Sequence, residues 1–130
     1  MAQRILVVDD ENDVQLVIKT ALQSEGFDVA TASNGPDALA EVANRQPDLI
    51  VLDVMMPGMT GFQVLEKLKS NEKTARIPVI MLTGVSERSK IQEALASGTD
   101  YYIVKPFEFH DLIGKVNSAL AAPLEDPFTI

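Results

Sequence analysis

The sequence contains no cysteine and no tryptophan, and it has a single histidine, His110, among its 130 residues. Without cysteine, the chain cannot form disulfide bonds or hold a metal through thiolates. No apolar run approaches the length that crosses a membrane, and the four-residue run that follows Arg4 is too short for a signal peptide. We therefore expect a cytoplasmic protein that does not associate with a membrane, and we assign no role to His110.

Basic residues are also scarce. The chain has 11 lysines and arginines against 19 aspartates and glutamates, which gives a net charge of −8. Proteins that bind nucleic acids on their own are typically basic, because they neutralise the phosphate backbone. The charge therefore argues against direct nucleic-acid binding by this chain, although it does not exclude a DNA-binding partner.

What the sequence does have is a regular alternation of strand-like and helix-like segments. Short apolar runs indicate five strands, at residues 5–8, 27–31, 49–52, 79–82 and 102–104. Apolar residues at helical spacing indicate a helix after each strand, with stripes within 14–22, 38–43, 62–68, 91–95 and 109–120. The first stripe consists of Val14, Val17, Ile18, Ala21 and Leu22.

This alternation predicts an α/β fold. Continuous apolar strands imply a parallel sheet with helices on both faces, and right-handed crossovers then favour a doubly wound, five-stranded sheet with five helices. We expect one domain over residues 1–121. Residues 122–130 contain two prolines and no periodicity, and we expect them to form a tail or the start of a linker.

Polar side chains follow directly after four of these strands. Asp9 and Asp10 follow the first, Asp53 the third, Thr83 the fourth and Lys105 the fifth. In an open parallel sheet the carboxyl ends of the strands line one crevice, where ligands bind. The five side chains should therefore converge, and together they suit binding of Mg²⁺ and of a phosphoryl group.

Each of these residues also has a simpler interpretation. Asp9, Asp10 or Glu11 can cap the helix that begins near Asn12, and Asp53 can be a turn residue. Against this, a carboxylate such as Asp53 is already ionised at pH 7, so it can attack a phosphoryl group without a general base. Repulsion among the three aspartates should raise at least one carboxylate pKa unless a cation intervenes.

The remaining two strand ends also allow either interpretation. Thr83 can be an ordinary strand residue, but a hydroxyl beside Gly84 can donate to a phosphoryl oxygen while the backbone comes close. Lys105 can be a solvated surface charge, but it precedes Pro106, a proline that can adopt the cis form and so hold the lysine in place. The order of all these residues along the chain is a stronger indication than any one of them.

That order resembles a known family. The motifs are Asp9-Asp10, residues 53–58 with Gly61, Thr83-Gly84, and Lys105-Pro106-Phe107. Over about residues 3–121 the chain resembles the receiver domain of two-component response regulators. The resemblance implies the flavodoxin-like strand order 2-1-3-4-5. It also implies a phosphoacceptor that catalyses only its own phosphorylation and dephosphorylation.

The resemblance further implies a role for each motif residue. Asp53 would receive the phosphoryl group from a sensor histidine kinase or a phosphotransfer protein. Asp9, Asp10, Asp53 and the backbone carbonyl of Met55 would hold Mg²⁺, or Mn²⁺ in its place. The phosphoryl group would contact Thr83, Gly84 and Lys105; Thr83 and Tyr102 would form the switch; Pro57, Gly61 and Pro106 would be structural.

The same resemblance implies partners for the chain and a lifetime for its phosphorylated state. A downstream effector or an output domain would respond to the face formed by the fourth and fifth helices and the fifth strand. A phosphorylation-dependent homodimer through that face is possible, although Asp100-Tyr101 and Lys115 depart from the charges of many DNA-binding relatives. In this family the positions of Met55 and Val85 flank the path of attacking water, and neither side chain can orient it, which predicts slow dephosphorylation.

Two other classes share elements of this pattern. A flavodoxin-like electron carrier would bind FMN phosphate in the loop after the first strand, but here that loop is Asp9-Asp10-Glu11, and no aromatic residues are placed to sandwich a flavin. A phosphatase with an aspartate nucleophile would carry Asp-x-Asp after the first strand, whereas this chain has Asp-Asp-Glu. The chain could also be a pseudo-receiver, but its residue set is complete.

Overall fold

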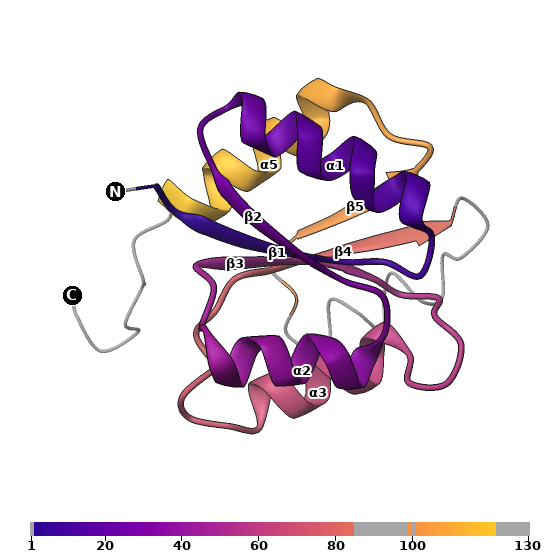
Figure 1. Cartoon of the computed structure of the whole chain (residues 1–130), viewed down its shortest axis with the longest axis vertical. Coiled ribbons are helices and arrows are strands. Elements are labelled where there is room, and N and C mark those ends of the chain that lie inside the picture. Colours follow the sequence, from indigo (N-terminus) through magenta and orange to yellow (C-terminus); the bar gives the residue numbers. More distant parts are fainter. Residues whose placement is uncertain (1, 85–98, 100, 122–130) are drawn as a thin grey trace.

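The computed structural model describes residues 2–84, 99 and 101–121. Its core is a parallel sheet of five strands in the order β2-β1-β3-β4-β5 (Figure 1). The strands are β1 (Arg4–Val8), β2 (Asp28–Ala32), β3 (Leu49–Asp53), β4 (Val79–Gly84) and β5 (Tyr101–Lys105). The helices are α1 (Asn12–Ser24), α2 (Gly35–Asn44), α3 (Gly61–Lys69) and α5 (Phe109–Ala121). The predicted fold class and strand order are confirmed.

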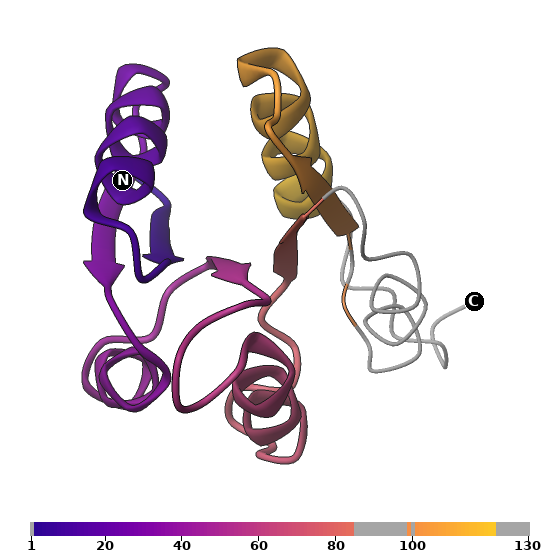
Figure 2. The same cartoon turned by 90° about the vertical axis from the view of Figure 1, so that its right-hand side faces the viewer.

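The helices form a layer on each face of the sheet. Helices α1 and α5 cover one face, and α2 and α3 cover the other (Figures 1 and 2). Every residue of β3 is buried, as are four of the five residues of β1. Two apolar clusters result, one on each face, with Leu6, Leu52 and Leu65 in the first and Ile18, Leu82 and Val116 in the second. Burial on both faces explains why the central strands are continuously apolar.

Local sequence signals set the helix boundaries on the α2–α3 face. Asn34 caps α2 by accepting a hydrogen bond from the Asp37 N–H, and Pro36 lies in the first turn. Thr60 and Gln63 form a capping box at the start of α3, which begins at Gly61. None of the helices in the described part of the chain is both long and apolar enough to cross a membrane.

The structure differs from the prediction in the face that α1 buries. Val17 was expected to point inward, but its side chain is 60% exposed, and the buried residue one turn before Ile18 is Gln15. Successive residues are about 100° apart around a helix, and the buried arc is centred near Ile18 and Leu22. Val17 lies outside that arc although it satisfies the apolar spacing.

The other differences are smaller. The second strand is Asp28–Ala32, one residue later than predicted, and it lies at an edge of the sheet as expected. Phe109 at the start of α5 is exposed. The helix predicted around Ile91, Ala94 and Leu95 lies outside the described residues, as do residues 122–130.

The burial of α1 predicts opposite results for two neighbouring substitutions. Ile18→Ala should lower the free energy of unfolding by about 2–5 kcal/mol, because it empties a fully buried position. Val17→Ala should change it by less than about 0.5 kcal/mol, because the side chain is largely in water. Urea unfolding of both variants measures this difference, and equal losses would mean that α1 packs with Val17 inward.

Candidate functional site

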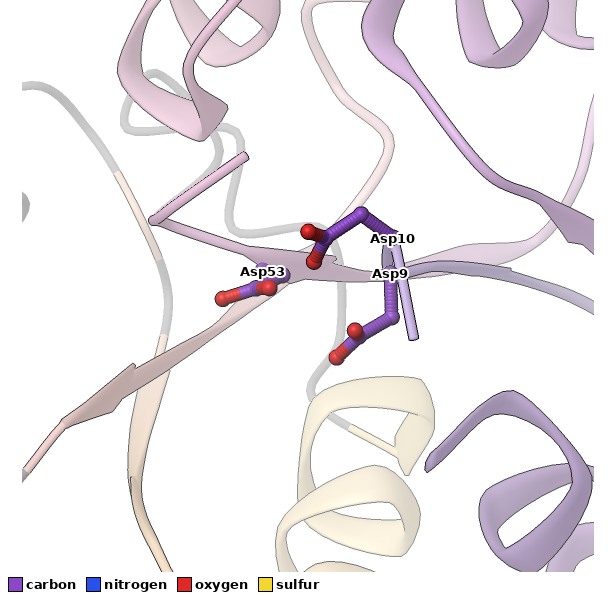
Figure 3. Close-up of side chains that lie close together, drawn as sticks. All are labelled: Asp9, Asp10 and Asp53. Carbon is purple, nitrogen blue, oxygen red and sulfur yellow. The ribbon is translucent and has the colours of Figure 1, made fainter. Parts of the chain in front are cut away.

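Three aspartates meet at the carboxyl edge of the sheet because their strands are neighbours. β1 and β3 are parallel with Val8 opposite Leu52, so Asp9 and Asp53 occupy the next position on each. One carboxylate oxygen from each of Asp9, Asp10 and Asp53 lies within 4.8 Å of the others. Figure 3 shows the three side chains converging from the two strand ends. The structure therefore brings together the acidic residues that the sequence indicated.

Asp9 is the most enclosed member of this group. It is fully buried; its Oδ1 accepts a hydrogen bond from the Glu11 N–H at 2.9 Å, and its Oδ2 lies 2.9 Å from Lys105 Nζ. Glu11 is the N-cap residue of α1, but its side chain makes no capping hydrogen bond. Glu11 therefore occupies the N-cap position, as the sequence allowed, but its side chain does not cap the helix.

Asp53 is almost as deeply buried, with 4% of the residue exposed. Its Oδ1 accepts the Met55 N–H at 3.2 Å, and its Oδ2 lies 3.5 Å from Lys105 Nζ. Burial raises the pKa of Asp53 to about 6, and the nearby charge of Asp9 adds to this, while Lys105 and the Met55 N–H oppose it. The expected rise in pKa is present, but burial, not repulsion, is its main cause.

Lys105, the last residue of the edge strand β5, connects the two buried aspartates. Its ammonium bonds Asp9 and pairs with Asp53, and its side chain is 24% exposed. Burial alone would lower the pKa of Lys105, but the hydrogen bond to Asp9 and the charges of Asp53 and Asp9 outweigh it and raise the pKa. Lys105 is therefore a permanently charged cation within the site at neutral pH.

Thr83 reaches the same edge but is not hydrogen-bonded to the aspartates. It is buried, one residue beyond Leu82, which is the partner of Asp53 in the sheet. In the described residues its hydroxyl donates only to the Gly84 carbonyl, at a long 3.5 Å. Gly84 in turn lies opposite Lys105 in the pairing of β4 and β5. Among the residues that the structure describes, the Thr83 hydroxyl thus has one weak hydrogen bond, and Thr83 lies one residue beyond the sheet partner of Asp53.

The two tyrosines of β5 pack on opposite faces of the sheet. Tyr102 packs against the cluster on the α2–α3 face, and Tyr101 packs against the cluster on the α1–α5 face. Both are half-buried. This is the alternation expected of neighbouring strand residues, and it places the two tyrosine side chains in different layers of the fold.

Gly61 allows α3 to lie directly against the strand that carries Asp53. A Cβ at Gly61 would come within 2.2 Å of the Asp53 carbonyl oxygen and 2.9 Å of Val54 Cα. The Gly61 N–H also donates to the Val54 carbonyl at 3.0 Å. Any larger residue would push α3 away from the end of β3, so the glycine is required by a close backbone approach.

The other residues that the sequence indicated form the rim of the site. Pro57 precedes Gly58, whose φ of +79° fits the turn after β3. The Lys105–Pro106 peptide bond is cis. Met55 follows Asp53 with its side chain 49% exposed, and Val85 lies outside the described residues.

Sequence reasoning missed one residue of this region, Gln15. Its side chain is buried and bonds the Asp9 carbonyl. The available signal was its place on α1: a polar side chain three residues before Ile18, inside the arc that faces the sheet.

The donor set fits a hard divalent cation. Carboxylate oxygens are the ligands that Mg²⁺ prefers, and it is usually held by one or two carboxylates with water and phosphate oxygens. Asp10 is exposed while Asp9 and Asp53 are buried, so the group opens to solvent on one side. The arrangement can accept a cation and an anionic group from that side.

Comparison with known proteins identifies the family. The family model for the response regulator receiver domain matches residues 5–117. The chain belongs to this family. The receiver domain is 38% identical over 120 residues to the phosphate regulon transcriptional regulatory protein PhoB of Rhizobium meliloti, covering 92% of this chain and 53% of that protein.

Two further relatives agree with this assignment. The DNA-binding response regulator MtrA of Mycobacterium tuberculosis is 38% identical over 127 residues, covering 98% of this chain and 54% of MtrA. The solved structure of chemotaxis protein CheY4 of Vibrio cholerae superposes with a TM-score of 0.87 at 32% identity, covering 92% of this chain and all of that one (100%). This receiver domain thus spans about half the length of the PhoB and MtrA relatives.

The raised pKa of Asp53 predicts a particular dependence of stability on pH. Between pH ~4 and ~6 the folded state binds the proton more tightly than the unfolded state, so ionising Asp53 destabilises the fold. In chelator, the unfolding free energy of the wild type relative to Asp53→Asn should therefore fall as pH rises through this window, by up to about 3 kcal/mol.

Urea unfolding at several pH values measures this difference. Glu72→Gln, which changes an exposed carboxylate outside the site, is the control and should keep the pH dependence of the wild type. A difference between wild type and Asp53→Asn that does not change with pH would contradict the assigned environment of Asp53.

Proposed function

We propose that this receiver domain accepts a phosphoryl group on Asp53 from a sensor histidine kinase or a phosphotransfer protein. The supporting observation is the environment of the Asp53 carboxylate, which lies 3.5 Å from the Lys105 ammonium and within 4.8 Å of carboxylate oxygens of Asp9 and Asp10. A pKa of about 6 leaves this carboxylate mostly ionised at neutral pH, which a nucleophile requires.

In the proposed transfer, a carboxylate oxygen of Asp53 forms a bond to phosphorus as the bond from phosphorus to the donor histidine nitrogen breaks. The leaving electron pair stays on the imidazole, which takes a proton from solvent. Lys105 neutralises negative charge as the phosphoryl group enters, because its ammonium already lies 3.5 Å from Asp53 Oδ2. Asp9, Asp10, Asp53 and the Met55 carbonyl would hold Mg²⁺ or Mn²⁺, which supplies further charge neutralisation.

The geometry argues against the two competing classes. A flavodoxin-like carrier needs a loop after β1 that binds phosphate. In this chain the loop after β1 contributes two carboxylates to the acidic group, and these would repel phosphate. A phosphatase of the Asp-x-Asp type would carry its nucleophile after β1, where Asp9 already bonds Lys105 and Glu11. We therefore propose a cytoplasmic signalling domain that catalyses only its own phosphorylation and dephosphorylation.

The output is proposed to pass through Thr83 and Tyr102. The weakly bonded Thr83 hydroxyl can move toward a phosphoryl oxygen, and Tyr102 can respond on the same face. A downstream effector or an output domain would read the surface around β5 and α5. PhoB is named as a transcriptional regulator and MtrA as DNA-binding. We propose that the acidic receiver domain does not itself contact DNA.

Dimerisation through the same surface is a second possible output. Lys115 of α5 pairs with Asp111 of the same helix at 2.5 Å, so this cation is already engaged within its own chain. We therefore propose that a phosphorylation-dependent homodimer, if it forms, does not depend on Lys115.

Phosphorylation of Asp53 can be tested with a small donor. With acetyl phosphate and Mg²⁺, the intact mass should rise by one phosphoryl group, and it should not rise in chelator. Asp53→Asn should abolish the gain, because the amide is not a nucleophile. Asp37→Asn, which changes an aspartate of α2, should leave the gain unchanged. Full modification of Asp53→Asn would overturn the assignment.

The switch can be tested by observing Tyr102 directly. In protein labelled with fluorotyrosine and carrying Tyr101→Phe, phosphorylation should shift the ¹⁹F resonance of Tyr102. Thr83→Ala should reduce this shift at equal phosphorylation, because a contact made only in the active state is lost. Thr83→Ser keeps the hydroxyl and should retain most of the shift; an equal shift in Thr83→Ala would exclude this role for the hydroxyl.

A further inference from the structure

The buried amide of Gln15 joins the acidic pair to the neighbouring loop. Gln15 lies on α1, whose other buried residues are apolar, and only 8% of it is exposed. Its Nε2 donates to the Asp9 carbonyl at 2.5 Å and to Ser33 Oγ at 3.0 Å, with the Ala32 carbonyl at 3.3 Å. One side chain thus fixes the end of β1 and the end of β2 together.

The carbonyl that Gln15 holds belongs to the peptide that joins Asp9 to Asp10. The N–H of Asp9 donates to the Ala32 carbonyl at 3.1 Å, so the backbone is fixed on both sides of Asp9. Asp10 differs from its neighbour: within the described residues its carboxylate has no hydrogen bond or ion pair. The backbone orientation from which the Asp10 side chain extends therefore depends on the peptide plane that precedes it.

The Asp9–Asp10 peptide needs to be held in place because the three carboxylates of the acidic group repel one another. Carboxylate oxygens of Asp9, Asp10 and Asp53 lie within 4.8 Å of one another, and Lys105 contacts only Asp9 and Asp53. Asp10 is the exposed member, so it is the one that can relax outward into water. A rotation of the Asp9–Asp10 peptide would move the whole Asp10 residue outward, and it would break the bond to Gln15.

We propose that Gln15 is a positioning residue for the metal site: its amide holds the Asp9–Asp10 peptide so that the Asp10 carboxylate stays aimed at Asp53 before a cation binds. The inference rests on the metal site of the proposed function and adds a residue outside the ligand set. Partners that orient metal ligands in this way typically change metal affinity by about 10–100-fold when they are lost.

The test is the affinity of the receiver domain for Mg²⁺, measured by titration calorimetry at a pH well above 6, without a phosphoryl donor. Gln15→Met keeps the length of the side chain but cannot donate to the Asp9 carbonyl. Its dissociation constant for Mg²⁺ should rise about 10-fold. Gln15→Glu should weaken binding as well, because a carboxylate facing the Asp9 carbonyl repels it.

A matched control separates positioning from general stability. Thr99 is also buried, and its hydroxyl contacts two backbone carbonyl oxygens, of Val79 at 2.9 Å and of Tyr101 at 3.0 Å, at the amino edge of the sheet. Thr99→Val should lower the free energy of unfolding and leave the Mg²⁺ dissociation constant unchanged. A purely structural role for Gln15 would give Gln15→Met the same pattern.

A second variant keeps the test valid if Gln15→Met does not fold. Ser33→Ala removes the hydroxyl partner of the amide at an exposed position, and it should weaken Mg²⁺ binding by a smaller factor than Gln15→Met does. If both variants fold and both bind Mg²⁺ with wild-type affinity, the inference is wrong. If Gln15→Met does not fold, wild-type affinity in Ser33→Ala overturns it. Absence of Mg²⁺ binding in the wild type would instead overturn the metal site of the proposed function.

Discussion

The ammonium of Lys105 is the interaction on which the rest of the site depends. Two buried carboxylates, Asp9 and Asp53, lie side by side at the end of an apolar sheet, where burial penalises their charged forms. Lys105 bonds one and pairs with the other. Without that cation, the Asp53 carboxylate would bind a proton more tightly, because Lys105 is the largest influence that lowers its pKa. Lys105 therefore favours the ionised form of Asp53 and holds the two carboxylates close together.

The fold makes this arrangement possible by supplying rigidity away from the charges. Apolar clusters on both faces fix β1, β3 and β4, and each strand ends within one residue of the site. Gly61 lets α3 close against the end of β3, and Gln15 ties the end of β1 to the loop after β2. The buried carboxylates gather at the carboxyl edge of the sheet, whereas at the amino edge Arg4 pairs with the opposite charges of Asp28 and Glu41. The backbone contacts at Gly61 and Gln15 thus lie where like charges are close together.

Much of this could be predicted from the sequence, because the relevant signals are local. Asp9, Asp53 and Lys105 each follow directly after an apolar strand, and the parallel topology then brings them together. Periodicity failed at Val17, because apolar spacing does not say where the buried arc of a helix is centred. Gln15 was missed for the same reason, since its role depends on a carbonyl six residues earlier. The main cause of the raised Asp53 pKa was also not predictable, because depth of burial is a property of the assembled fold.

The cost of ionising Asp53 links chemistry at the site to the conformation of the domain. A group whose pKa is raised by folding destabilises the folded state once it is charged, and a ligand that favours the charged form must reverse that effect. A cation that binds beside Asp53 would lower the free-energy cost of ionising this carboxylate. A phosphoryl group on the buried Asp53 oxygen would remove the charge from that oxygen and would extend toward Thr83. Either event would change the electrostatic free energy at the carboxyl edge of the sheet. Thr83 is buried there with a long, weak hydrogen bond, and Tyr102 is half-buried on the face next to it. Within the described residues, a weakly hydrogen-bonded hydroxyl and a half-buried tyrosine thus lie near the carboxylate whose pKa is raised. Modification of Asp53 could shift the conformation of these two side chains only to the extent that the phosphoryl group interacts more favourably with one of their positions than with another, and such a difference is the link that we propose between the chemistry and the output.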